Sequence, residues 1–346
     1  KIVTDNTDSQ HPNYKTTTSY IDRFVYQYIG TETGEDTLQY FPTEEGRVRY
    51  IPASESYTYD YFIKDHLGNV RMVLTEETND AAYAATMESQ NATAENQLFD
   101  NISSTTTSKP TGFDTDGNNH SVSKLNGSSG NSNGSNKRVG PSLVLKVMAG
   151  DIITIAAYGW YNGPVQPPPT GASNILNDFL NALTGNVIDN SSGKFNSGQT
   201  TPVSDAISPS AATFVTDDNT NNYNSTRPKA YLNWVAFDNE FNFVSSNSNA
   251  VQMPLRNSGK QKQALVAPQL TIQKNGYIYI YLSNESAQDV YFDDLVVHHT
   301  SGPILQEDHY YPFGLTMAGI SDQAALKMEN RFKYNGKELQ HKEFSD

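Results

Sequence analysis

The chain of 346 residues contains no cysteine. This absence excludes disulfides, thiolate metal sites and cysteine nucleophiles, and it leaves the redox compartment unreadable. Tryptophan is scarce, with 2 residues. No apolar run approaches the roughly 20 residues that a membrane-spanning helix requires, so we expect no membrane insertion. The 24 basic residues are outnumbered by 38 acidic ones and form no long run, so we expect no nucleic-acid partner.

Compact catalytic motifs are also missing. The sequence has no His-Glu-x-x-His pair and no phosphate-binding loop. Carboxylates are plentiful, but nothing in the sequence fixes the separation of any two of them, as the pair of a glycoside hydrolase requires. We therefore predict that the chain is not an enzyme.

Alternating polar and apolar residues, typical of β-strands, are abundant. In residues 276–282 (GYIYIYL), three tyrosines alternate with aliphatic side chains, so the two sets point to opposite faces of a strand. Few stretches have helical spacing, and the clearest is 174–183. These patterns predict an all-β chain. Further runs rich in β-branched and aromatic residues are 141–148, 151–160, 230–237 and 289–297.

The connections between these runs carry two kinds of signal. The tripeptide Ala-Gly-Asp at 149–151 favours a turn and predicts a hairpin over residues 143–160. By contrast, residues 103–138 and 188–228 lack periodicity and are rich in small polar residues. We predict that these two stretches are long mobile loops.

Residues 57–74 (YTYDYFIKDHLGNVRMVL) predict a β-hairpin, since two apolar strands flank a turn whose Gly and Asn suit positive φ. The segment also resembles the YD-repeat of RHS proteins, whose unit pairs a Tyr-Asp strand with a DHLGNVR-like turn. The residues that match this repeat motif are Tyr59, Asp60, Asp65, Gly68, Asn69 and Arg71.

Two segments near the other end carry the same resemblance. Residues 309–315 (HYYPFGL), with Tyr311, Pro312, Phe313 and Gly314, and residues 330–339 (NRFKYNGKEL) resemble the elements that lead into the RHS-repeat-associated core of Bacteroidota-type proteins. The resemblance implies a large secreted or cell-surface protein. In such proteins the repeat hairpins build a β-shell, commonly around a C-terminal toxin or effector, as in polymorphic toxins.

About 230 residues separate the two ends of this resemblance, where an ordinary repeat has a short loop. We therefore predict repeat strands over 1–80 and 301–346, with an inserted domain over 81–300. An insertion needs its own core and neighbouring termini, and an antiparallel β-sandwich meets both conditions. The fold class we expect is all-β, with repeat hairpins flanking an inserted sandwich of the jelly-roll type that carries the long loops.

The predicted insert resembles jelly-roll carbohydrate-binding modules at its first strand (85–99) and its last (290–297). This resemblance implies a structural calcium shared by Glu88 with Asp293 or Asp294, and carboxylates are suitable ligands for this cation. Adjacent residues alternate faces in a strand, so only one of the two aspartates is expected to point inward. The alternative is that both are solvated carboxylates at a sheet edge.

A stripe of aromatic residues offers a second kind of site. Tyr277, Tyr279 and Tyr281 share one strand face, and with Trp160 and Trp234 they could stack on sugar rings. Aromatic residues on sheets also pack in cores, which is the alternative.

The sequence thus favours a non-catalytic segment of a secreted or surface RHS-repeat protein, carrying a calcium-stabilised jelly roll outside the β-shell. The partners expected are the rest of the shell and a downstream toxin or effector. The alternative is a carbohydrate-binding or adhesin module on an RHS scaffold, which would bind surface glycans.

Overall fold

The computed structural model describes residues 2–4, 15–30, 34–115, 117, 120–128, 137–167, 188–189, 193–194, 209–216, 224–256, 261–317, 320–324, 328–337 and 339. The helix expected over 174–183 lies outside these residues. The chain divides into two units. The terminal unit comprises residues 1–78 and 303–346, and the insert comprises residues 79–302.

The prediction of an all-β fold is confirmed. In both units, every strand pairing within the described residues is antiparallel. Antiparallel sheets tolerate one solvated face, which fits the alternation of polar and apolar residues along these strands.

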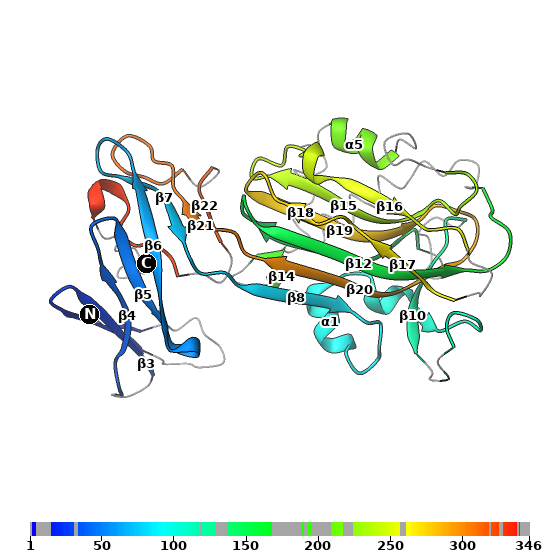
Figure 1. The fold of residues 1–346 in the computed structure, drawn as a ribbon, viewed down its shortest axis with the longest axis horizontal. Helices are drawn as coiled ribbons and strands as arrows, with labels where there is room; N and C mark the ends of the chain where they lie inside the picture. The colour runs from blue at the N-terminus through cyan, green and yellow to red at the C-terminus, as the bar shows by residue number, and fades with distance from the viewer. Residues whose placement is uncertain are drawn as a thin grey trace. The chain divides into compact units, whose positions relative to one another are not determined.

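The terminal unit is built on one nine-stranded sheet, part of which is the blue group of strands in Figure 1. The sheet follows chain order until β7, whose next neighbour is β21 from beyond the insert. Short 3-10 helices η1 (Pro52–Ser54) and η4 (Tyr334–Gly336) complete the unit. The strands, in spatial order, are β1 (Ile2–Thr4), β2 (Lys15–Ile21), β3 (Phe24–Gly30), β4 (Thr37–Pro42), β5 (Gly46–Ile51), β6 (Ser56–Lys64), β7 (Val70–Thr75), β21 (Ile304–Glu307) and β22 (Asp322–Gln323).

The insert contains a seven-stranded and a four-stranded sheet. The seven-stranded sheet runs β17 (Gln263–Val266), β12 (Ile152–Tyr161), β20 (Val290–Thr300), β10 (Ser121–Leu125) and β9 (Thr106–Ser108), with β18 (Leu270–Thr271) on β12 and β8 (Asp80–Ala85) on β20. The four-stranded sheet runs β11 (Val139–Val147), β19 (Gly276–Asn284), β15 (Ala230–Asp238) and β16 (Asn249–Gln252). The smaller elements are α1 (Ala92–Leu98), α2 (Ile102–Thr105), β13 (Ile188–Asp189), β14 (Gly193–Lys194), α5 (Pro209–Thr216) and η3 (Ser245–Asn247).

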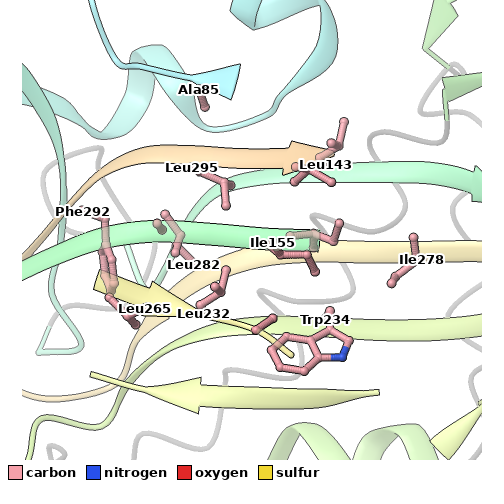
Figure 2. Close-up of a cluster of buried hydrophobic side chains, with 14 of the residues drawn as sticks. Ala85, Leu143, Ile155, Leu232, Trp234, Leu265, Ile278, Leu282, Phe292 and Leu295 are labelled. Atoms are coloured by element: carbon pink, nitrogen blue, oxygen red, sulfur yellow. The ribbon is translucent and has the colours of Figure 1, made fainter. Parts of the chain in front are cut away.

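The two sheets of the insert face each other across one hydrophobic core. Ile155 and Phe292 belong to the seven-stranded sheet, and Leu232 and Ile278 belong to the four-stranded sheet. Figure 2 shows these side chains in one buried cluster, with Trp234 among them. Alternate residues of long strands such as β12 and β19 enter this core, so the period-two pattern of the sequence builds an antiparallel sandwich.

The hairpin predicted over 143–160 is wrong. β11 belongs to the four-stranded sheet and β12 to the seven-stranded sheet, so the turn at 148–151 carries the chain across the core. Gly150 adopts φ +93°, and the Asp151 carboxylate accepts hydrogen bonds from the amides of Met148 (2.8 Å) and Gly302 (2.6 Å). Turn chemistry marks where the chain reverses, but it does not say whether the flanking strands pair.

The prediction of long mobile loops is also wrong for parts of both polar stretches. Within 103–138, strand β10 pairs with β20 and buries Val122 and Leu125. Within 188–228, helix α5 packs Ala211 and Phe214 into a second cluster with residues of the four-stranded sheet. A five-residue strand with two apolar side chains is too short to stand out from its polar surroundings.

The first and last residues of the insert lie side by side. β8 pairs with β20 from Asp80 opposite Thr300 onward, and the backbone of Ser301 donates to the carbonyl of Asn79 at 2.9 Å. Neighbouring ends are what insertion of a folded domain into a loop requires.

Candidate functional site

The turn of the Tyr-Asp segment confirms the predicted hairpin. β6 pairs with β7, and the amide of Gly68 donates to the carbonyl of Asp65 at 2.9 Å. One carboxylate oxygen of Asp65 accepts hydrogen bonds from the amides of Leu67 and Asn69 at 2.9 and 3.0 Å. Gly68 adopts the expected positive φ of +82°, but Asn69 does not. The Asn is therefore needed for a reason other than backbone conformation.

Asn69 connects this turn to the C-terminal segment of the terminal unit. The side chain is buried, and its amide nitrogen donates to Asp65 at 2.7 Å. Its Oδ1 accepts a hydrogen bond from the backbone of Asn335 at 2.8 Å, and the next residue, Val70, donates its amide to the carbonyl of Lys333 at 3.1 Å. The YNGKE segment is thus fixed against the turn of the DHLGNVR segment.

The HYYPFGL segment meets the same strand. The Tyr310 hydroxyl donates to the carbonyl of Val70 at 2.9 Å, and the Arg71 guanidinium lies over the Tyr310 ring at 5.6 Å. Arg71 also lies 2.9 Å from His309 Nδ1, and the rings of Tyr310 and Tyr334 meet edge to face at 5.8 Å. Three motifs from the two ends of the chain therefore converge on one surface of the terminal unit.

The YYPFG residues form a tight turn of their own. Gly314 donates its amide to the carbonyl of Tyr311 at 3.0 Å, with Pro312 and Phe313 as the central residues. Gly314 adopts φ +93°, and a Cβ atom there would lie 2.6 Å from the Tyr334 ring, so both conformation and space require glycine. Phe313 has φ +80° although it is not glycine, and its side chain is 96% exposed.

Asp60 lies on the opposite face of β6 from Tyr59 and is buried between two arginines. Its carboxylate accepts hydrogen bonds from Arg47 Nε at 2.7 Å and from Arg49 Nε and Nη2 at 2.7 and 3.0 Å. Burial alone would raise the pKa of Asp60, but the hydrogen bonds and charges of Arg49 and Arg47 outweigh it and lower that pKa. Arg49 also binds Glu77 at 2.7 Å.

Arg47 extends this buried network to the C-terminal segment. Its two terminal nitrogens donate to the carbonyls of Met328 at 3.2 Å and Glu329 at 3.4 Å. The sequence analysis did not single out Arg47 or Arg49. In β5, these arginines alternate with Val48, a pattern that is usually read as a solvated polar face.

The predicted calcium ligands Glu88, Asp293 and Asp294 contact different partners: Glu88 meets His120 and Ser121, whereas both aspartates pair with Lys262. Glu88 Oε1 lies 3.2 Å from His120 Nδ1 and accepts the amide of Ser121 at 3.2 Å. In the described part of the chain, no three acidic or histidine side chains form a group that could hold a metal. The calcium site therefore stays a prediction. Helix α1 carries another buried carboxylate, that of Glu95, which accepts a hydrogen bond from the amide of Thr86 at 2.8 Å.

Asp293 and Asp294 do not alternate as expected. The register of β20 against β12 shifts at Ala157, and Asp294 adopts φ +48°. This β-bulge lies between Phe292 and Leu295, whose side chains both belong to the inner core. A bulge adds one residue to a strand, so the side chains of neighbouring residues no longer alternate between the two faces of the sheet. Both aspartates therefore reach the same lysine on the outer side of the sheet.

That lysine is Lys262, which directly precedes β17. Its ammonium lies 3.3 Å from Asp293 and 3.4 Å from Asp294. Burial, and then the charge of Asp294, raise the pKa of Asp293 to about 6, although Lys262 acts in the opposite direction. The ammonium also lies 4.6 Å from the ring centre of Tyr158 and 5.5 Å from that of Phe113.

Four of the five proposed sugar-stacking residues are interior, which corrects that prediction. Tyr279 and Tyr281 are buried, in a cluster with residues of helix α5. Trp234 lies in the main core. Trp160 is buried in contact with other rings. Tyr277 is half-buried and stacks on Phe241 at 5.5 Å. The tyrosine stripe does point away from the main core, but α5 packs against it.

No protein-family profile, curated protein or solved structure compared with the chain matches it. No helix in the described ranges is long and apolar enough to cross a membrane.

Proposed function

We propose that this chain is a non-catalytic structural segment of a large secreted or surface RHS-repeat protein, in which the terminal unit continues a β-shell and the insert is an accessory sandwich domain. The observation that carries this proposal is the convergence of the DHLGNVR, YYPFG and YNGKE segments. Asn69 hydrogen-bonds Asn335, 266 residues away in sequence, and Tyr310 hydrogen-bonds Val70, 240 residues away.

The polar groups of these motifs support a structural rather than a chemical role. Asp60 is satisfied by Arg47 and Arg49, and Asp65 by amides of its own turn. Such networks fix strand register and hold segments together, and they leave the carboxylates committed to hydrogen bonds inside the protein.

One face of the terminal sheet supports the idea that it meets a partner. Tyr57, Tyr59, Tyr61 and Ile63 alternate along β6 and are all at least 41% exposed, while the residues between them are turned the other way. Contiguous exposed aromatic surface is typical of interaction sites. In the proposed shell this face would contact enclosed material, such as a downstream toxin or effector domain.

The test is a cryo-electron microscopy reconstruction of the longer secreted protein that would contain this chain. The proposal predicts that the strands of the terminal unit continue into neighbouring repeats and form a closed wall, with the insert outside the enclosed space. A terminal sheet with solvent on both faces and no neighbouring repeats would contradict it.

A carbohydrate-binding insert is the second candidate, and one observation favours it. Tyr158 is 40% exposed on the outer side of the seven-stranded sheet, and Tyr291 lies half-buried on the same side. A glycan array with the full chain and with Tyr158→Ala tests this function. Binding that depends on Tyr158 would support it, and an array without binding would leave the scaffold as the role of the insert.

A further inference from the structure

On the outer side of the seven-stranded sheet, an amine lies in contact with two carboxyl groups. Lys262 Nζ lies 3.3 Å from Oδ2 of Asp293 and 3.4 Å from Oδ2 of Asp294. The lysine directly precedes β17, both aspartates belong to β20, and β12 lies between these two strands in the sheet. The contact therefore joins two strands that are not neighbours.

The surroundings hold the amine against the Asp293 carboxyl. The backbone amide of Lys262 donates to the carbonyl of Phe113 at 2.5 Å. The amine lies 4.6 Å from the ring centre of Tyr158 and 5.5 Å from that of Phe113, and the Asp293 side chain is only 7% exposed. Two reactive groups held in contact do not have to find each other by diffusion, which removes much of the entropic part of a reaction barrier.

The Asp293 carboxyl is also polarised by the backbone. Its Oδ1 accepts a hydrogen bond from the amide of Asp294 at 3.0 Å, so a donor lies where negative charge develops when a nucleophile adds to Cγ. Burial, and then the charge of Asp294, raise the pKa of Asp293 to about 6, which favours the protonated acid more than in an ordinary aspartate.

We propose that Lys262 and Asp293 form an intramolecular isopeptide bond, with Asp294 as the base. One ammonium proton passes to the Asp293 carboxylate, which gives an amine and a carboxylic acid. Nζ then adds to Cγ, and Asp294 accepts a second proton from the nitrogen. Asp294 returns this proton to Oδ2, which leaves as water. The Nζ–Cγ bond forms, the Cγ–Oδ2 bond breaks, and nothing is oxidised or reduced.

The bond forms slowly after folding, because the ion pair itself opposes the first step. Burial lowers the pKa of Lys262, but the charges of Asp293 and Asp294 outweigh it and raise that pKa, so transfer of the ammonium proton is uphill. Freshly folded protein therefore keeps the Asp293 carboxyl and the pH dependence of stability that this carboxyl confers. Both disappear as the bond forms.

The test follows the mass of the full chain by intact-protein mass spectrometry, from purification until the mass no longer changes. The proteins are the wild type, Lys262→Arg, Asp294→Asn and Lys124→Arg. Arginine keeps the positive charge but has no amine to acylate. Lys124 is the matched control, because its ammonium pairs with a single and more exposed carboxylate, Asp289, at 2.9 Å.

We expect the wild type and Lys124→Arg to lose the mass of one water molecule, and Lys262→Arg to keep its full mass. Asp294→Asn should lose the water roughly 100-fold more slowly, which is the usual contribution of a positioned base. A protease digest of the wild type should contain a branched peptide in which Lys262 is joined to Asp293.

A wild type that keeps its full mass would overturn the proposal. So would a loss of water that persists in Lys262→Arg, because the Asp-Gly pair at 116–117 also loses one water when it closes to a succinimide. An equal rate in Asp294→Asn and wild type would overturn the role of Asp294 as the base. If Lys262→Arg does not fold, the wild-type digest decides alone, and absence of the branched peptide refutes the bond.

Discussion

The substitution Asp60→Asn isolates the charge of the buried carboxylate that joins β6 to β5. Asn has nearly the same shape, so no cavity forms. The change leaves two buried guanidinium groups, those of Arg47 and Arg49, without their shared counter-ion. Breaking a buried ion pair by neutralising one partner costs about 3–5 kcal/mol. Arg49 keeps Glu77, which places the expected loss near the lower value, about 3 kcal/mol.

The two tryptophans make the assay selective for each unit. Trp160 and Trp234 both lie in the insert, so tryptophan fluorescence reports the unfolding of the insert, whereas circular dichroism reports both units. Asp60→Asn should move only the dichroism transition of the terminal unit. With a urea dependence of about 1–3 kcal/mol/M, the midpoint should fall by roughly 1–3 M.

The matched control is Asp36→Asn, the same chemical change at an exposed position, which should alter stability by less than about 0.5 kcal/mol.

The lowered pKa of Asp60 also makes the stability of the terminal unit depend on pH. The stabilisation is present above the unfolded pKa of about 3.9 and is lost as pH falls through the folded pKa. Equal midpoints for Asp60→Asn and Asp36→Asn would refute the reasoning.

Three further predictions concern single residues. Gly68→Val should destabilise the hairpin by about 1–2 kcal/mol because Gly68 adopts φ +82°, and unchanged dichroism melting would count against the turn assignment. Tyr279→Ala should destabilise the insert by about 3–5 kcal/mol, since the side chain is fully buried; an unchanged tryptophan-fluorescence midpoint would contradict its burial. The pKa of Asp293, raised to about 6, means that the folded insert keeps a proton that the unfolded chain loses near pH 4. Stability of the insert should therefore fall by up to about 3 kcal/mol as pH rises from about 4 to 6, and Asp293→Asn should flatten this slope; an identical slope in the variant would disprove the assignment.

Local patterns in the sequence were sufficient to predict many of the strands and the hairpin turn at Gly68. The alternation in β19 and the Gly68 turn depend on side-chain period and backbone conformation, which neighbouring residues determine. The pairing of strands was less predictable. Both strands around Gly150 were expected correctly, but their assignment to opposite sheets depends on contacts with β19 and β20, more than 100 residues away.

The predictions of candidate sites failed where packing between distant segments decides whether a side chain is exposed. The tyrosines of β19 do share one face, as the sequence predicts, but helix α5 covers that face from a segment that had no clear pattern. The shared orientation of Asp293 and Asp294 depends on a bulge, and a bulge leaves no signal in a run of strand-forming residues. The role of Arg47 and Arg49 follows only from their contacts with Asp60.

The central claim, that a self-contained domain interrupts a unit made from both ends of the chain, has a direct test. Residues 79–302 are replaced by a short Gly-Ser linker from Thr78 to Pro303, between strands β7 and β21 that already pair. We predict that the shortened protein folds with a cooperative dichroism transition that Asp60→Asn still lowers. A shortened protein without cooperative unfolding would contradict the claim, because the terminal unit would then depend on the insert for its structure.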